Sequence, residues 1–86
     1  MGRVRDRNSA VQKTGYTVDE RQIIWGPEHS GEYWISDGWI WGPTNSGLYW
    51  IDPHGEIRDR SGRRTSFRLD QDVLVGPEDE SPPWLR

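Results

Sequence analysis

Short apolar stretches alternate with turn sequences along most of the chain. In the first stretch of each pair, an aromatic and an aliphatic residue lie two positions apart, which is the side-chain period of a β-strand. These residues are Tyr16 and Val18, Tyr33 and Ile35, Tyr49 and Ile51, and Phe67 and Leu69. A polar link rich in Asp, Gly or Pro then leads into a second apolar stretch, so the pattern predicts a series of β-hairpins.

The second apolar stretches predict strands at residues 23–25, 39–41, 56–58 and 73–75. Three of them end at a Gly-Pro pair, where proline has no N–H group to continue a hydrogen-bonded ladder. Helices are not expected, because Gly and Pro interrupt every window long enough to hold one. We therefore predict an all-β fold of roughly eight to ten short antiparallel strands.

Two internal blocks of the sequence are nearly identical. Residues 24–35 read IWGPEHSGEYWI and residues 40–51 read IWGPTNSGLYWI, a shift of sixteen positions. Weaker echoes occur at residues 74–77 (LVGP) and in the resemblance of residues 4–7 (VRDR) to residues 57–60 (IRDR). In such a repeat each copy is one supersecondary unit, which must pack on its neighbours to bury its apolar face.

The repeat predicts a single domain over residues 1–86. Hairpin copies are expected at about residues 14–30, 31–46, 47–64 and 65–77, with an N-terminal half copy at 2–9 and a C-terminal tail at 78–86. The predicted fold is an antiparallel meander of short hairpin repeats with a period of about 16 residues. It is either partly closed, like a barrel, or a single sheet that pairs with a second copy. The tail sequence at residues 81–84 (SPPW) is interpreted as a structural latch that folds onto a Trp-lined groove, either of its own molecule or of a neighbour.

Comparing the copies with one another separates the two faces of each strand. The aromatic and aliphatic positions of the first strands stay apolar in every copy, and so do the central positions of the second strands. Because successive strand residues point to opposite faces, this constant face is predicted to be the core. The other face is polar in the outer copies and aromatic in the middle ones. Its aromatic residues are Trp25, Trp34, Trp39, Trp41 and Trp50.

These Trp residues are the candidate binding site, and three interpretations of them stay open. The rings form a second core layer if the sheet folds over or closes on itself. Alternatively, they form a surface for self-association, or a surface for a ligand or protein partner. Large exposed apolar patches on a monomer usually mark interfaces or ligand grooves.

Composition is consistent with a small aromatic core. The chain has 86 residues, of which 31% are hydrophobic and six are Trp, and it has no Cys for disulfides or thiolate metal sites. Each buried aromatic ring removes roughly 150–250 Å² from water, so a few Trp rings replace many aliphatic side chains. No apolar run approaches the roughly 20 residues of a membrane span, and no signal-peptide core follows Met1. We therefore expect a soluble, cytoplasmic protein.

The charge pattern argues against a general polyanion-binding protein. The net charge is -3 and the pI is about 5.2, whereas nucleic-acid modules usually carry a basic excess. Arginine residues cluster at residues 3–7 and 58–68, in the copies that are poor in Trp. Stacking rings and cations are thus separated along the sequence, and nucleic acid is not expected as a partner.

Candidate catalytic residues are few. His29 falls at a loop position that Asn occupies in the next copy, and His54 lies in the turn at residues 52–55 (DPHG), beside a carboxylate that could orient its imidazole. Ser30 and Ser46 recur in step with the repeat, which explains them structurally before any nucleophilic role. Two histidines with scattered carboxylates lack the ligand spacing of a metal site. We therefore predict no catalytic residues, no metal and no cofactor.

Together these features predict a non-enzymatic binding or assembly module. It uses the Trp-rich face for self-association, as a homodimer, or for a protein partner. The alternative is a small module for carbohydrate or proline-rich peptides, because planar rings stack on sugars and line grooves that recognise proline-rich segments. The alternative differs in predicting a monomer whose Trp emission changes when the ligand is added.

Overall fold

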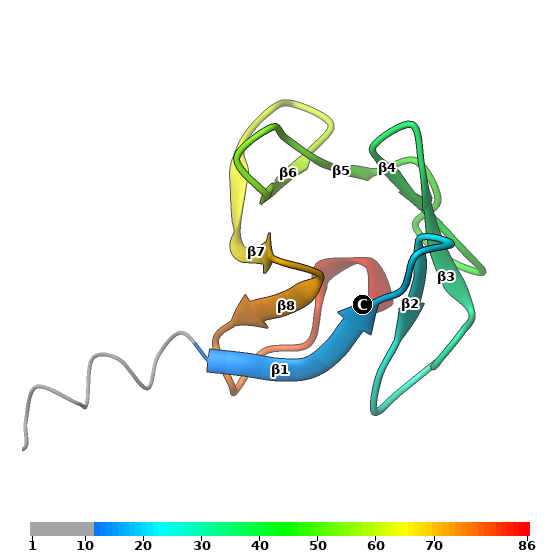
Figure 1. Ribbon diagram of the computed structural model, residues 1–86. Coiled ribbons are helices and arrows are strands. Elements are labelled where there is room, and N and C mark those ends of the chain that lie inside the picture. The colour runs from blue at the N-terminus through cyan, green and yellow to red at the C-terminus, as the bar shows by residue number, and fades with distance from the viewer. Residues whose placement is uncertain (1–11) are drawn as a thin grey trace, which may run out of the picture.

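The computed structural model of the chain describes residues 12–86, which form eight strands and one short 3₁₀ helix (Figure 1). The strands are β1 (Gln12–Val18), β2 (Ile23–Trp25), β3 (Tyr33–Ser36), β4 (Trp39–Trp41), β5 (Tyr49–Ile51), β6 (Glu56–Asp59), β7 (Arg64–Asp70) and β8 (Val73–Gly76), and the helix is η1 (Pro83–Leu85). Among the second strands, β2 and β4 have the predicted bounds, and β6 and β8 are one residue longer. The half copy predicted at residues 2–9 lies outside the described residues.

The strands form one closed antiparallel barrel. Each strand pairs with the next in sequence, and β8 pairs with β1, so the sheet has no free edge. Figure 1 shows the strands arranged around a central axis, with β1 and β8 side by side. The predicted all-β hairpin meander is confirmed, in its closed form. An open sheet that pairs with a second copy is not formed, because β1 and β8 satisfy each other's backbone groups.

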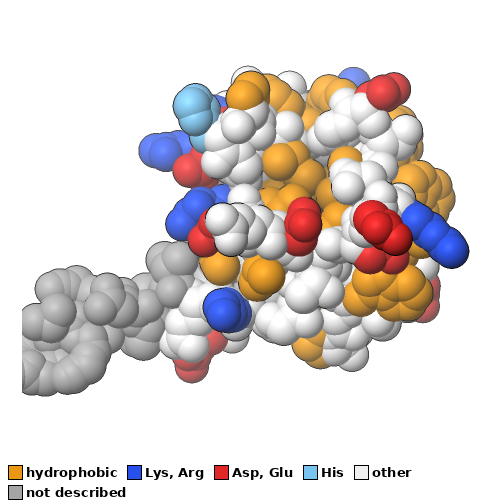
Figure 2. Space-filling model, in the orientation of Figure 1, with side chains coloured by type: hydrophobic (Ala, Val, Ile, Leu, Met, Phe, Trp, Pro, Cys, Tyr) orange, Lys and Arg blue, Asp and Glu red, His pale blue; other side chains and the backbone are white. Residues whose placement is uncertain are grey.

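The inner face of the barrel is the face that stays apolar in every copy. Ile40, Ile57 and Phe67 are each only 1% exposed. The buried apolar residues are Tyr16, Val18, Ile24, Tyr33, Ile35, Ile40, Ile57, Phe67, Leu74 and Trp84, with Tyr49, Ile51, Leu69 and Leu85 packed against them. The cavity left among these side chains measures about 10 Å³, no more than a single water requires. Apolar side chains thus fill the centre of the barrel, with charged groups around them (Figure 2).

Aspartate side chains shape three of the hairpin turns. Asp52 Oδ1 accepts hydrogen bonds from the backbone N–H groups of His54 and Glu56, both at 2.9 Å. Asp19 and Asp59 accept the equivalent pairs of bonds in the β1–β2 and β6–β7 turns. A carboxylate oxygen that accepts two turn N–H groups stabilises the reversal through local contacts.

One position in each of these turns has a left-handed backbone. Gly55 (φ +86°) and Gly62 (φ +91°) occupy it in two turns, and Gln22 (φ +68°) occupies it in the β1–β2 turn. Glycine adopts this conformation without the clash that a Cβ atom causes. The Gln22 turn is therefore strained, whereas its two counterparts are not.

The Gly-Pro pairs at the strand ends have a packing role that the sequence interpretation missed. The rings of Tyr16, Tyr33 and Phe67 lie directly against Gly26, Gly42 and Gly76, respectively. At Gly42, a Cβ atom would come within 2.2 Å of Tyr33 Cδ2. Proline ends the strand, as expected, but the preceding glycine makes room for a core ring.

The C-terminal tail closes the barrel interior. Trp84 in η1 is 2% exposed and lines the same interior as Ile24, Ile40 and Leu74. The tail therefore folds back onto its own barrel, but the predicted target was wrong. Trp84 packs among aliphatic core residues and not against the Trp residues of the variable face.

Candidate binding surface

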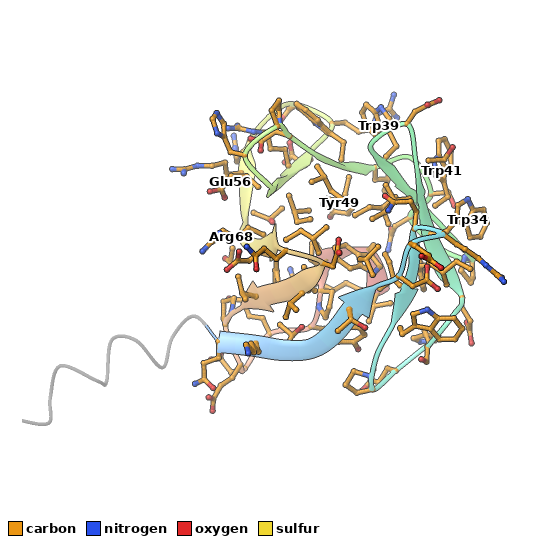
Figure 3. All side chains as sticks on the ribbon, in the orientation of Figure 1. Trp34, Trp39, Trp41, Tyr49, Glu56 and Arg68 are labelled. Carbon is orange, nitrogen blue, oxygen red and sulfur yellow. The ribbon has the colours of Figure 1, made fainter. Side chains whose placement is uncertain are left out.

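The Trp residues of the variable face lie on the outside of the barrel. We call Trp25, Trp34, Trp39, Trp41 and Trp50 the Trp patch. In Figure 3, Trp34, Trp41 and Trp39 follow one side of the barrel, and Glu56 and Arg68 lie on the other. The structure excludes a second core layer made of these rings, because the sheet closes with this face outward and none of the five belongs to the core cluster.

Strand register joins most of the Trp patch directly. Trp34 on β3 lies opposite Trp41 on β4, and Trp39 on β4 lies opposite Trp50 on β5. The rings of Trp39 and Trp50 are 6.0 Å apart between centroids and inclined by 36°. Cross-strand aromatic pairs at such distances stabilise one another. The outer face of β3–β5 therefore carries two cross-strand Trp pairs, Trp34 with Trp41 and Trp39 with Trp50.

Two rings of the patch are anchored on their own loops. A Cβ atom at Gly31 would lie 2.8 Å from the Trp25 ring, and one at Gly47 would lie 3.2 Å from the Trp41 ring. Trp25 Nε1 also donates to Asp19 Oδ2 at 2.8 Å. A backbone N–H of β2, and secondarily this indole N–H, lower the pKa of the Asp19 carboxyl. The recurrence of Trp and Gly in the two blocks thus has a structural explanation.

An ion pair borders the patch next to Trp50. The Trp50 indole N–H donates to Asp59 O at 2.9 Å. In the pairing of β5 with β6, Trp50 lies opposite Arg58. Arg58 Nε donates to Asp52 Oδ2 at 2.7 Å, and Arg58 Nη1 donates to Gly62 O at 2.7 Å. The guanidinium is the main cause of a lowered pKa for Asp52, which is 7% exposed.

The position of Arg58 corrects one assumption about the basic residues. The sequence separates Arg from Trp by copies, but the barrel register places Arg58 directly beside Trp50. Its charge is taken up by Asp52, so it does not offer a free cation to a ligand at this point. The expectation that nucleic acid is not a partner stays a prediction.

Trp34 differs from the anchored rings. It is 47% exposed, close to the 43% of Trp25, but no hydrogen bond to its indole is found within residues 12–86, whereas the Trp25 indole donates to Asp19. Its cross-strand neighbours, Ile23 and Trp41, are also apolar. Of the three corresponding positions in other copies, one holds Trp50 and the other two hold Thr17 and Arg68, so the barrel does not need an aromatic side chain here. Sequence reasoning placed Trp34 in the site but could not distinguish it from its neighbours.

Both histidines belong to turns. His29 has a left-handed backbone (φ +55°) like Asn45 in the next loop, and its Nδ1 lies 3.1 Å from Glu32 Oε1 on the surface. At His54 the backbone N–H contacts Asp52, so that carboxylate does not orient the imidazole through this bond. Within the described part of the chain, no group of three His, Asp or Glu residues is placed to hold a metal ion.

Comparison with known proteins finds no family model, curated protein or solved structure that matches the chain. Over residues 12–86, no helix has the length and apolar character needed to cross a membrane. The fold and site define a small, filled β-barrel with an aromatic outer surface.

Proposed function

We propose that the protein is a non-enzymatic binding or assembly module whose Trp patch docks onto a second copy of the chain or onto a protein partner. The observation that carries this proposal is Trp34. Trp25 and Trp34 are similarly exposed, at 43% and 47%, but Trp25 is held by Asp19 and Gly31, whereas the Trp34 indole lies between apolar neighbours with no hydrogen bond among the described residues. An apolar surface patch that includes large exposed rings commonly marks an interface.

The filled interior supports a site on the outer surface. Pockets that hold small ligands usually enclose roughly 300–1,000 Å³. The cavity inside this barrel is about 10 Å³. Exposed Trp rings, in contrast, are the residues that most often dominate the energy of protein interfaces.

The open face of Trp34 sets the size of the expected effect. About half of its side chain is exposed, which corresponds to roughly 100 Å² of a large aromatic ring. At about 25 cal/mol per Å², covering this area contributes roughly 2.5 kcal/mol, or a factor of about 60 in Kd. In a symmetric dimer each copy buries one such ring, so the effect on dimerisation is larger.

Trp34→Arg tests the proposal, because Arg68 shows that the barrel accepts arginine at the corresponding outer position. We expect sedimentation equilibrium to show a monomer–dimer equilibrium for the wild-type chain and a shift towards monomer for the variant. The thermal midpoint of the variant, extrapolated to low concentration, is expected to match that of the wild type. Arg68→Thr is the matched control and leaves the dimer unchanged.

One result would narrow this assignment, and another would contradict it. A wild-type chain that stays monomeric at every concentration rules out self-association and restricts the patch to a different protein. A Trp34→Arg variant that unfolds several degrees below the wild type as a monomer makes Trp34 a structural residue.

A further inference from the structure

The tail, together with Pro77 before it, fills one end of the barrel as a bound peptide fills its site. Trp84 is buried in the core, and Pro82 and Pro83 before it are buried as well. The main-chain bonds found for the tail are Glu80 N–H to Pro77 O, Leu85 N–H to Pro82 O and Arg86 N–H to Pro83 O. All of them are internal to residues 77–86, and β8 ends at Gly76. No strand pairing within residues 12–86 therefore ties the tail to the sheet.

Hydrogen bonds from one loop reach the main chain of the tail. Thr44 Oγ1 and Asn45 Nδ2 donate to Trp84 O at 3.2 and 2.9 Å, and Asn45 Nδ2 also donates to Arg86 O at 2.9 Å. Tyr33 Oη lies 2.6 Å from Thr44 Oγ1 and holds this hydroxyl in place. The β4–β5 loop thus contacts backbone carbonyls of the tail in the way that peptide-binding sites contact their ligands.

Thr44 and Asn45 are two of the three positions at which the two matching loops differ in sequence, the third being Leu48. The β2–β3 loop has Glu28 and His29 at these positions. His29 has the same backbone φ of +55° as Asn45, but its ring contacts Glu32 within its own loop. The donors that hold the tail are therefore not a general property of the repeat. They are specific to the loop beside the tail.

Trp84 has one polar atom that its burial leaves unsatisfied. Its Nε1 is buried and has no hydrogen-bond partner among the described residues. A buried donor without a partner opposes burial, because the indole N–H is hydrogen-bonded to water when the tail is free. The tail is consequently held less tightly than its apolar contacts alone would imply, which favours exchange.

We propose that this end of the barrel is a socket for a Pro-Pro-Trp segment, which the tail fills in its own molecule and which the tail of a second copy can fill instead. Exchange of a terminal segment between identical chains leads to dimers at low cost, since each socket makes the same contacts before and after. Residues 77–81 form the hinge. The socket involves no residue of the Trp patch, so this proposal does not rest on the proposed function.

The test supplies the segment as a separate molecule. A labelled peptide with the sequence of residues 81–86 (SPPWLR) is added to the full chain carrying Trp84→Ala, whose own tail has lost its ring. We expect saturable one-to-one binding by fluorescence anisotropy and a higher thermal midpoint with the peptide. A peptide with Ala in place of Trp is expected to bind about a hundredfold more weakly, because it lacks the buried ring. Adding Asn45→Ala to the same chain is expected to weaken binding of the SPPWLR peptide.

A second variant covers the case in which Trp84→Ala does not fold. Pro83→Gly keeps the core ring but loosens the tail, so it binds the peptide about tenfold more tightly than the wild type. In the wild type the attached tail competes at an effective concentration in the millimolar range. Trp34→Arg is the control outside the socket, and it leaves peptide binding unchanged. Because the two sites are separate, a partial shift of Trp34→Arg towards monomer is compatible with the socket, provided that a dimer fraction sensitive to the peptide remains.

The exchange itself is read from dimers of the wild-type chain. We expect a dimer fraction that excess SPPWLR peptide dissociates and that Trp34→Arg does not remove. Equal binding of the Trp and Ala peptides, or no binding to a folded variant with a weakened tail, overturns the socket. Peptide binding without any peptide-sensitive dimer overturns the exchange between copies.

Discussion

Replacing Gly42 with Ala is expected to destabilise the barrel strongly, although glycine-to-alanine changes in extended segments are usually mild. The added Cβ atom would lie 2.2, 2.5 and 2.7 Å from Cδ2, Cε2 and Cγ of Tyr33. All three distances are far below van der Waals contact, and the ring is 3% exposed, so it has little room to move. Tyr33 must leave its place in the core, or the β4–β5 loop must move away from it.

The magnitude lies between two limits. Overpacking that the surroundings absorb costs about 1–3 kcal/mol. Complete expulsion of a ring that buries roughly 200 Å² costs about 5 kcal/mol. We expect about 3 kcal/mol, which lowers the thermal midpoint of a domain of this size by at least about 12 °C. Loss of the contact between Tyr33 Oη and Thr44 Oγ1 adds to this effect.

Urea unfolding followed by Trp emission measures this cost, and a double-mutant cycle with Tyr33→Leu identifies its cause. In the Tyr33→Leu background the Cβ atom meets no ring, so Gly42→Ala is expected to be neutral or slightly stabilising. The coupling free energy is then about 3 kcal/mol. An equal cost of Gly42→Ala in both backgrounds would refute the steric explanation.

The remaining predictions concern the turns and their carboxylates. Gln22→Gly removes the strain of a left-handed backbone at a residue with a Cβ atom, and it is expected to raise the free energy of unfolding in urea by about 0.5–1 kcal/mol. Gly62→Gln introduces the same strain at a position with no neighbouring atoms in the way, and it is expected to lower the free energy of unfolding by a similar amount. Because Arg58 holds the folded-state pKa of Asp52 below its unfolded value of about 4, the stabilisation is complete above that pH and is lost as the pH falls below it. Asp52→Asn should therefore flatten the decline in unfolding free energy between pH 5 and pH 3, and an unchanged decline would show that other carboxylates cause it.

The strands and their inward face were predictable because they depend on neighbours in the sequence. A spacing of two places Tyr33 and Ile35 on one side of a strand wherever that strand lies. Closure was not predictable in this way. The pairing of β1 with β8 brings Thr14 Oγ1 within 2.9 Å of Leu74 O, across sixty residues, and no local pattern records such a contact.

The candidate site was predictable as a set but not residue by residue. Alternation places Trp25, Trp34 and Trp41 on the outer face, but the sequence pattern does not show which of these rings is held by its loop. What separates them is whether a loop glycine lies beneath the ring, which depends on the path of the loop. Trp84 was misplaced for a related reason, since the space that it fills exists only once the barrel has closed.

The seam between β1 and β8 has a consequence for how the chain folds during synthesis. Each hairpin can form as soon as its own residues are available, but the seam waits for β8, the last strand. Until then the growing sheet has two unpaired edges, which can pair with edges of other chains. Because closure depends on pairing between strand edges, two fragments of the chain could also assemble into the barrel. A break in the loop at residues 42–48 would leave two halves of four strands each, and each half presents the edges that the other lacks.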